Sequence, residues 1–197
     1  MSSTGYTREK DTIIIDRDLN ELDLFVKEFL EILKKHTEYL IVSGYISIAT
    51  GRARGTEDVD LLLPIISKEK FRALFVDLYK NDFWCYQGDD DKEVYAYLES
   101  TANIRFAKKN KMFPNMEIVP INTKKKIQYF EFTHPQKIQI RDLAFKIPPI
   151  EFEIAYKEIL LGATKDISDA KHLRAFFSEI IQEKKIKEYK NFIRENT

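Results

Sequence analysis

The sequence lacks the features that mark secreted, membrane-spanning and disulfide-stabilised proteins. It has one cysteine, Cys85, among 197 residues, so no internal disulfide can form. No apolar run approaches the length of about 18 residues that a membrane-spanning helix needs. No charged-then-apolar leader opens the chain. We therefore expect a protein of the reducing cytoplasm that has no membrane partner.

The sequence also lacks an excess of charge of either sign and the common cofactor-binding motifs. Lys and Arg number 32, as do Asp and Glu, so no overall field attracts nucleic acid or an anionic membrane. There is no P-loop, no Rossmann glycine motif, no zinc-type Cys/His spacing and no G-x-S-x-G. The composition is 44% hydrophobic and 13% aromatic, which is typical of a globular protein.

The most informative stretch runs from Tyr39 to Pro64. An apolar run stops at Ser43-Gly44, and Asp58-Val59-Asp60 then leads into three consecutive leucines. Side chains alternate along a strand, so Asp58 and Asp60 share a face, about 7 Å apart along the chain. Two carboxylates beside a buried strand are costly to desolvate without a cation, which favours a divalent metal. The alternative is structural: the Asp residues belong to a turn and a strand cap, and Ser43-Gly44 is a permissive turn.

This order of motifs resembles the signature of the nucleotidyltransferase superfamily, which has a DNA polymerase beta-like fold. Ser43-Gly44 stands where the family has Gly-Gly or Gly-Ser, which is a departure. Arg54, Thr56, Asp58 and Asp60 form R-x-T-x-D-x-D, which is most similar to the AbiEii-type toxin and small archaeal nucleotidyltransferase branch. The resemblance implies that both Asp residues bind Mg or Mn, and that Ser43, Gly44, Arg54 and Thr56 contact the nucleotide.

A third carboxylate is predicted on a later strand. Met116 to Ile121 reads as an apolar strand in which Glu117 is the single charge. The family carries its third carboxylate in such a pattern, so the resemblance implies that Glu117 joins Asp58 and Asp60 as metal ligand and catalytic residue. Alternation also allows Glu117 to face water on an edge strand.

The C-terminal part contains a further pattern that resembles the same branch. A helix from Ile150 to Leu161, closed by Gly162, carries Lys157, and Lys165-Asp166-x-x-Asp169 opens the next helix. The resemblance implies that Lys157 and Lys165 contact the nucleotide phosphates. In the structural alternative, Asp166 is an N-cap and Asp169 its third-position partner. Both interpretations stay open from the sequence.

The remaining elements follow from hydrophobic periodicity and turn residues. Helices are expected from a cap at Asp18 to about His36, from Lys68 to about Asn81 after a Ser67 cap, and from about Lys184 onward. A strand is expected over 102–106 and a hairpin within 128–147. Residues 1–11 are expected to fray, Gly88 to Asp91 to form a solvated turn, and Val94 to Leu98 to extend or coil.

We expect an α/β (α+β) fold with a nucleotidyltransferase-type mixed sheet flanked by helices. The expected parts are a flexible segment over 1–17, a core over 18–147 and a helical part over 148–197 packed on that core. The resemblance implies transfer of a nucleoside monophosphate from an NTP to a hydroxyl of an RNA such as tRNA, a protein or a small molecule. A role in a toxin–antitoxin system fits this branch. The alternative is a non-catalytic, antitoxin-like interaction module, favoured by Ser43 in place of glycine and opposed by the three carboxylates.

Overall fold

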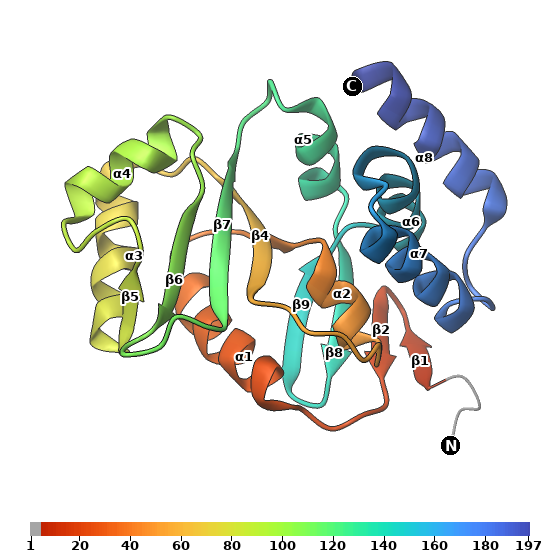
Figure 1. The fold of residues 1–197 in the computed structure, drawn as a ribbon, viewed down its shortest axis with the longest axis horizontal. Coiled ribbons are helices and arrows are strands. Elements are labelled where there is room, and N and C mark those ends of the chain that lie inside the picture. The colour runs from red at the N-terminus through yellow and green to blue at the C-terminus, as the bar shows by residue number, and fades with distance from the viewer. Residues whose placement is uncertain (1–4) are drawn as a thin grey trace.

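The computed structural model describes residues 5–197 as two mixed β-sheets flanked by helices (Figure 1). The larger sheet has the strand order β3-β4-β7-β6-β5. Its strands are β3 (Leu40–Ile41), β4 (Asp58–Pro64), β5 (Phe83–Cys85), β6 (Ile104–Lys108) and β7 (Asn115–Ile121). Only β4 and β7 run parallel, and the other neighbours are antiparallel. The expected α/β fold with a mixed sheet is confirmed.

The smaller sheet joins the N-terminal segment to the last part of the predicted core. Its order is β1-β2-β8-β9, from β1 (Tyr6–Glu9), β2 (Thr12–Ile15), β8 (Gln136–Ile140) and β9 (Leu143–Ile147). β2 pairs in parallel with β8, and β8 and β9 form the hairpin expected from the sequence. The segment expected to be flexible over 1–17 therefore contains two paired strands; its residues 1–4 lie outside the described residues. Alternation in Thr12–Ile15, with Ile13 and Ile15 buried, is the signal that the sequence analysis missed.

Strand β4 lies inside the larger sheet, between β3 and β7, and its side chains are apolar on both faces beyond Asp60. Val59, Leu61 and Leu63 on one face are fully buried and Leu62 on the other face is 3% exposed, as expected for a strand covered on both sides. The parallel register with β7 places Asp60 directly opposite Glu117. The sheet thus fixes the relative position of the carboxylates that the sequence singled out.

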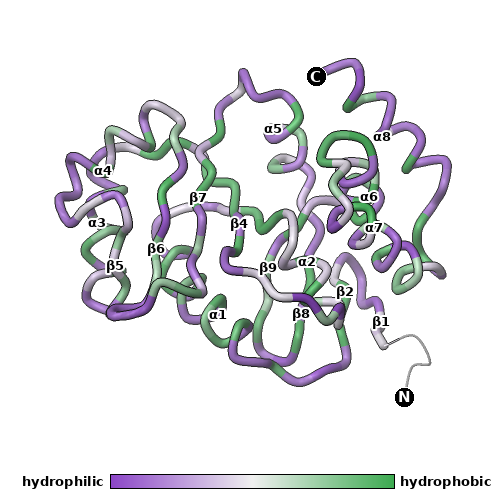
Figure 2. The backbone as a smooth tube through the Cα atoms, viewed as in Figure 1, coloured by the Kyte–Doolittle hydropathy of each residue, from purple (hydrophilic) through white to green (hydrophobic). Residues whose placement is uncertain are grey.

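Helices flank both sheets (Figures 1 and 2). They are α1 (Glu21–Leu33), α2 (Gly44–Ala49), α3 (Lys68–Lys80), α4 (Asp91–Glu99), α5 (Lys126–Thr133), α6 (Ile150–Tyr156), the π-helical turn η1 (Lys157–Leu161), α7 (Thr164–Phe176) and α8 (Glu183–Asn196). Figure 2 shows green strands at the centre and a mostly purple α8. Within residues 5–197, no helix has both the length and the apolar character needed to cross a membrane.

Two helices that the sequence analysis missed lie close to the larger sheet. Asp90 caps α4 through bonds from the backbone N–H groups of Lys92 and Glu93, so the predicted solvated turn is a helix start and Val94 to Leu98 is helical. α5 replaces the first part of the expected 128–147 hairpin. Its apolar residues have little helical periodicity, which explains why the pattern did not reveal it.

Helix starts differ from the sequence predictions at two places. The cap of α1 is Asn20 rather than Asp18, and Asn20 and Asp23 form a capping box. The cap of α7 is Ala163, so Asp166 is no N-cap but lies buried in the first turn. By contrast, the Ser67 cap and the left-handed Gly162 that ends η1 are confirmed.

Candidate functional site

Three carboxylates gather at the start of β4 and β7. Asp58 and Asp60 share one face of β4, and Glu117 faces them from β7. One carboxylate oxygen from each residue lies within 4.8 Å of the other two. The prediction that these three side chains lie together is confirmed. Such an all-oxygen set is the donor type that Mg²⁺ and Mn²⁺ prefer.

Asp60 carries the strongest electrostatic perturbation of the three. Burial, followed by the negative charges of Asp58 and Glu117, raises the pKa of Asp60 from 3.8 to about 7. A hydrogen bond with the Ser43 side chain opposes this rise. A bound cation would remove the repulsion among the three carboxylates, so the residues present fit a divalent metal.

Neighbouring side chains orient the other two carboxylates. Oε1 of Glu117 accepts hydrogen bonds from Nδ2 of Asn103 and Nη2 of Arg105, both at 2.8 Å. The Thr56 hydroxyl donates to the backbone carbonyl of Asp58 at 2.8 Å. The same hydroxyl lies 3.4 Å from Oδ1 of Asp58, so Thr56 contacts both the backbone and the carboxylate of this residue. The sequence analysis did not identify Asn103 or Arg105, because a cross-strand partner depends on register.

Ser43 and Gly44 form the turn from β3 into α2, as predicted. Ser43 has φ +65° and ψ −133°, a conformation that costs a non-glycine residue about 1–3 kcal/mol. This geometry explains why glycine suits the first position of such a pair. Serine at this position adopts the strained backbone and also provides a hydroxyl that forms a hydrogen bond with Asp60.

Gly44 is required by the close approach of Arg54. A β-carbon at Gly44 would lie 2.7 Å from Nη2 of Arg54. Arg54 is held in turn by Asp169 of α7, through an Nη1 to Oδ2 contact of 2.5 Å. The 51–57 loop is thereby fixed both to the start of α2 and to α7.

Asp169 is the centre of a buried ionic network. It is fully buried and pairs with Arg52, Arg54 and Lys157. Lys157 is also fully buried, with Nζ 3.3 Å from Asp169 and 3.2 Å from Glu153. The network joins η1 and α7 to the loop before β4, so the C-terminal helices are attached next to the carboxylate cluster.

The two lysines implied by the resemblance have different surroundings. Lys157 lies inside the ionic network, whereas Lys165 is exposed in the first turn of α7. The backbone carbonyl of Lys165 accepts a hydrogen bond from Arg52 at 3.4 Å. The structure therefore brings Lys157 and Arg54 together through Asp169 and leaves the Lys165 side chain facing solvent.

A cavity of about 180 Å³ adjoins Asp60, and we call it the Asp60 pocket. It is lined by Val42, Ser43, Asp60, Leu62, Val119, Gln128, Glu131, Glu153, Tyr156 and Leu161. Burial first, and then the carboxylates of Glu131, Glu153 and Asp60, raise the pKa of Tyr156 above its usual value. The pocket thus lies between the carboxylate cluster and helices α5 and α6.

The sequence analysis did not identify Glu131 or Glu153 as site residues. A signal existed, because each is a charged residue among apolar ones, in Phe130-Glu131-Phe132 and in Phe152-Glu153-Ile154. A single charge inside an apolar helix segment is rarely buried without a reason. Glu131 was missed because the sequence analysis did not predict helix α5, which carries it.

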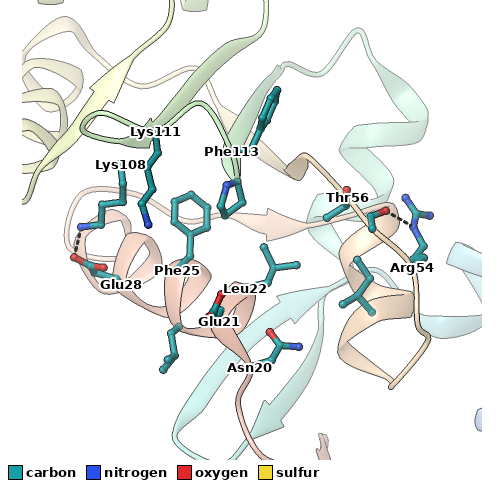
Figure 3. Close-up of a pocket in the computed structure, with 14 residues that line it drawn as sticks. Asn20, Glu21, Leu22, Phe25, Glu28, Arg54, Thr56, Lys108, Lys111 and Phe113 are labelled. Atoms are coloured by element: carbon teal, nitrogen blue, oxygen red, sulfur yellow. Dashed lines mark hydrogen bonds and ion pairs between the residues drawn. The ribbon is translucent and has the colours of Figure 1, made fainter.

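A larger cleft of about 950 Å³ lies on the other side of the 51–57 loop (Figure 3). None of Asp58, Asp60 and Glu117 lines it; Arg54, Gly55 and Thr56 connect it to the carboxylate cluster. Figure 3 shows Phe25 among the side chains that line this cleft and the exposed Phe113 ring pointing away from them, with Lys108 bonded to Glu28 at the rim. The groups that could bind a metal lie in the carboxylate cluster and not in this larger cleft, so we take the cluster as the candidate functional site.

The fold is shared with a known nucleotidyltransferase-like structure. No protein-family model matches the sequence, and no curated protein matches it. A solved structure of an antigenic nucleotidyltransferase-like protein from Paracoccidioides brasiliensis is similar, with a TM-score of 0.51 and 15% identity over 91% of each chain. The likeness shows that this chain has a nucleotidyltransferase-like fold, as the sequence motifs predicted. The narrower resemblance to the AbiEii-type branch stays a prediction.

Proposed function

We propose that this protein is a Mg- or Mn-dependent nucleotidyltransferase. It would transfer a nucleoside monophosphate from an NTP to an acceptor hydroxyl. The observation that carries the proposal is the meeting of Asp58, Asp60 and Glu117 across two paired strands. The nucleotidyltransferase-like fold of a structural neighbour supports the same class of activity.

The three carboxylates would hold the divalent cation and the chain around them would hold the nucleotide. A bound divalent cation supplies neutralisation of phosphate charge and activation of the acceptor oxygen. Glu117 is kept in place for this role by Asn103 and Arg105. The backbone at Ser43 and Gly44 would bind the triphosphate.

The cations near the cluster would complete the phosphate site. Arg54 lies next to Gly44 and can exchange its contact with Asp169 for one with a phosphate oxygen. Lys157 would act from behind Asp169, and Lys165 would reach the phosphates from the surface of α7. Thr56 would hold the backbone at Asp58. In the transfer, the acceptor oxygen bonds to the α-phosphorus and pyrophosphate leaves.

We further propose that the acceptor is an RNA such as tRNA, a protein or a small molecule, and that the protein acts within a toxin–antitoxin system. The sequence resemblance to the AbiEii-type branch supports this system. A non-catalytic interaction module with this fold would not need three clustered carboxylates, nor hydrogen bonds that hold one of them in place. The arrangement around Glu117 therefore favours an enzyme.

Incubation with each α-labelled NTP, Mg²⁺ and cell extract tests the proposal. We expect label to enter an acceptor, and Asp58→Asn and Asp60→Asn each to reduce labelling by about a hundredfold or more, since a catalytic metal contributes several kcal/mol. Glu117→Gln should reduce labelling more than NTP binding, because its role is greatest in the transition state. Asp89→Asn, at an exposed position, is the matched control. Labelling that continues unchanged in both β4 variants would refute the site.

A further inference from the structure

The Asp60 pocket contains a carboxyl group that the proposed metal site leaves unexplained. Glu131 on α5 is 3% exposed and lines this pocket. Among residues 5–197, no side chain or backbone group forms a hydrogen bond or ion pair with its carboxylate. Glu153, the neighbouring buried acid, has Lys157 as its partner. Glu131 is therefore the buried acid of this pocket whose hydrogen-bonding capacity is unused.

An unpaired buried carboxyl group is energetically unfavourable. Burial, and then the charge of Glu153, raises the pKa of Glu131 well above its usual value. This shift favours the neutral carboxylic acid, which presents one O–H donor beside one C=O acceptor. Both polar atoms of this group therefore need hydrogen-bond partners from whatever occupies the pocket that Glu131 lines.

Glu131 does not belong to a cluster of potential metal ligands. Within the part of the chain that the structure describes, the group of three or more such residues with ligand atoms within 4.8 Å of one another is Asp58, Asp60 and Glu117. An organic group with its own donor and acceptor suits Glu131 better than a second metal does.

We propose that the Asp60 pocket binds the base of the nucleotide and that Glu131 pairs with the edge of that base. Every nucleobase has an edge with a donor and an acceptor side by side, which is the complement of a neutral carboxylic acid. The walls formed by Val42, Leu62 and Val119 suit the apolar faces of an aromatic ring. This proposal rests on the proposed function, since it places the triphosphate at Ser43 and Asp60.

The size of the pocket agrees with one ring system rather than a whole nucleotide. Its volume of about 180 Å³ lies below the roughly 300–1,000 Å³ of pockets that enclose a whole drug-sized ligand. The remainder of the nucleotide would extend over Asp60 toward Gly44. Glu131 would then be a positioning residue that anchors the base while the carboxylate cluster faces the phosphates.

Two substitutions and two ligands test the assignment. Affinities for an NTP and for inorganic tripolyphosphate, both with Mg²⁺, are measured by calorimetry for wild type, Glu131→Leu and Glu131→Gln. We expect Glu131→Leu to weaken NTP binding about tenfold or more, the effect of one lost paired contact, and to leave tripolyphosphate binding unchanged. Glu131→Gln keeps a donor beside an acceptor and should retain most of the NTP affinity.

Folding and charge are controlled separately. Removal of an unpaired buried carboxyl should leave the melting temperature unchanged or raised, so Glu131→Leu is expected to fold. Glu151→Leu on α6, outside the Asp60 pocket, is the matched control and should bind NTP as wild type does. Wild-type NTP affinity in Glu131→Leu, or equal losses of NTP and tripolyphosphate affinity, would overturn the base assignment alone. Absence of both NTP and tripolyphosphate binding in wild type would overturn the proposed function and the assignment with it.

Discussion

Replacement of Asp60 by Asn should stabilise the metal-free protein at alkaline pH. Asp60 has its pKa raised to about 7, so the folded protein holds this proton more tightly than the unfolded chain does. The resulting stability is fully present below the unfolded pKa of about 3.8 and is lost as pH rises through 7. At pH 8 the folded protein carries the cost of an ionised, repelled carboxylate. Asparagine at this position has no charge to repel.

The size of the effect follows from the pKa displacement. A change from 3.8 to about 7, at 1.36 kcal/mol for each tenfold change in proton affinity, gives a ceiling of about 4 kcal/mol. Relaxation of Asp58 and Glu117 lowers that ceiling, so we expect a gain of about 2–4 kcal/mol in the free energy of unfolding at pH 8. For a chain of this length, each kcal/mol raises the melting temperature by about 2–4 °C.

Thermal denaturation with EDTA at pH 5 and pH 8 measures this gain. Asp60→Asn should melt higher than wild type at pH 8, and the difference should be smaller at pH 5, where Asp60 is protonated in the folded protein but mostly ionised in the unfolded chain. Added Mg²⁺ should stabilise wild type at pH 8 but not the variant, because only wild type binds the ion. Asp89→Asn is the exposed control. A metal-free Asp60→Asn protein that is no more stable than wild type at pH 8 would refute the electrostatic reasoning.

Two further substitutions test the ionic network and the turn before α2. Lys157→Met leaves the buried carboxylates of Glu153 and Asp169 uncompensated and should cost about 3–5 kcal/mol in denaturant unfolding; a stable variant with weakened NTP affinity would instead make Lys157 a phosphate ligand. Gly44→Ala places a β-carbon 2.7 Å from Arg54 and should cost about 1–3 kcal/mol by displacing it. Arg54→Ala in the same background should remove that added cost, and a full penalty in the double variant would contradict the clash.

The sequence predicted the centre of the fold better than its periphery, for a physical reason. β4 and β7 are apolar strands whose few acidic residues stand out, so the family resemblance could assign Asp58, Asp60 and Glu117 to one site before any pairing was known. The parallel register that brings Glu117 opposite Asp60 could not be read from either strand alone, since register is set by the whole sheet.

The missed features share a dependence on distant contacts. α5 has weak periodicity and owes its helical form to packing, so the pattern analysis placed a hairpin there. Asp166 and Asp169 fit a capping motif in sequence, yet Asp169 is held by three cations from two other segments. Glu131 was overlooked for a similar cause, because its burial follows from the docking of α5 beside the Asp60 pocket.

The parallel pairing of β2 with β8 has a consequence for the order in which this protein folds on the ribosome. Ile13 pairs with Ile138, so about 125 further residues are synthesised after β2 before its second neighbour, β8, leaves the ribosome. At about 5–20 residues per second, that wait is on the order of ten seconds. During it, Thr12–Ile15 exposes an apolar strand edge that invites pairing with another chain. The smaller sheet is therefore completed only after all three carboxylates of the site have been synthesised.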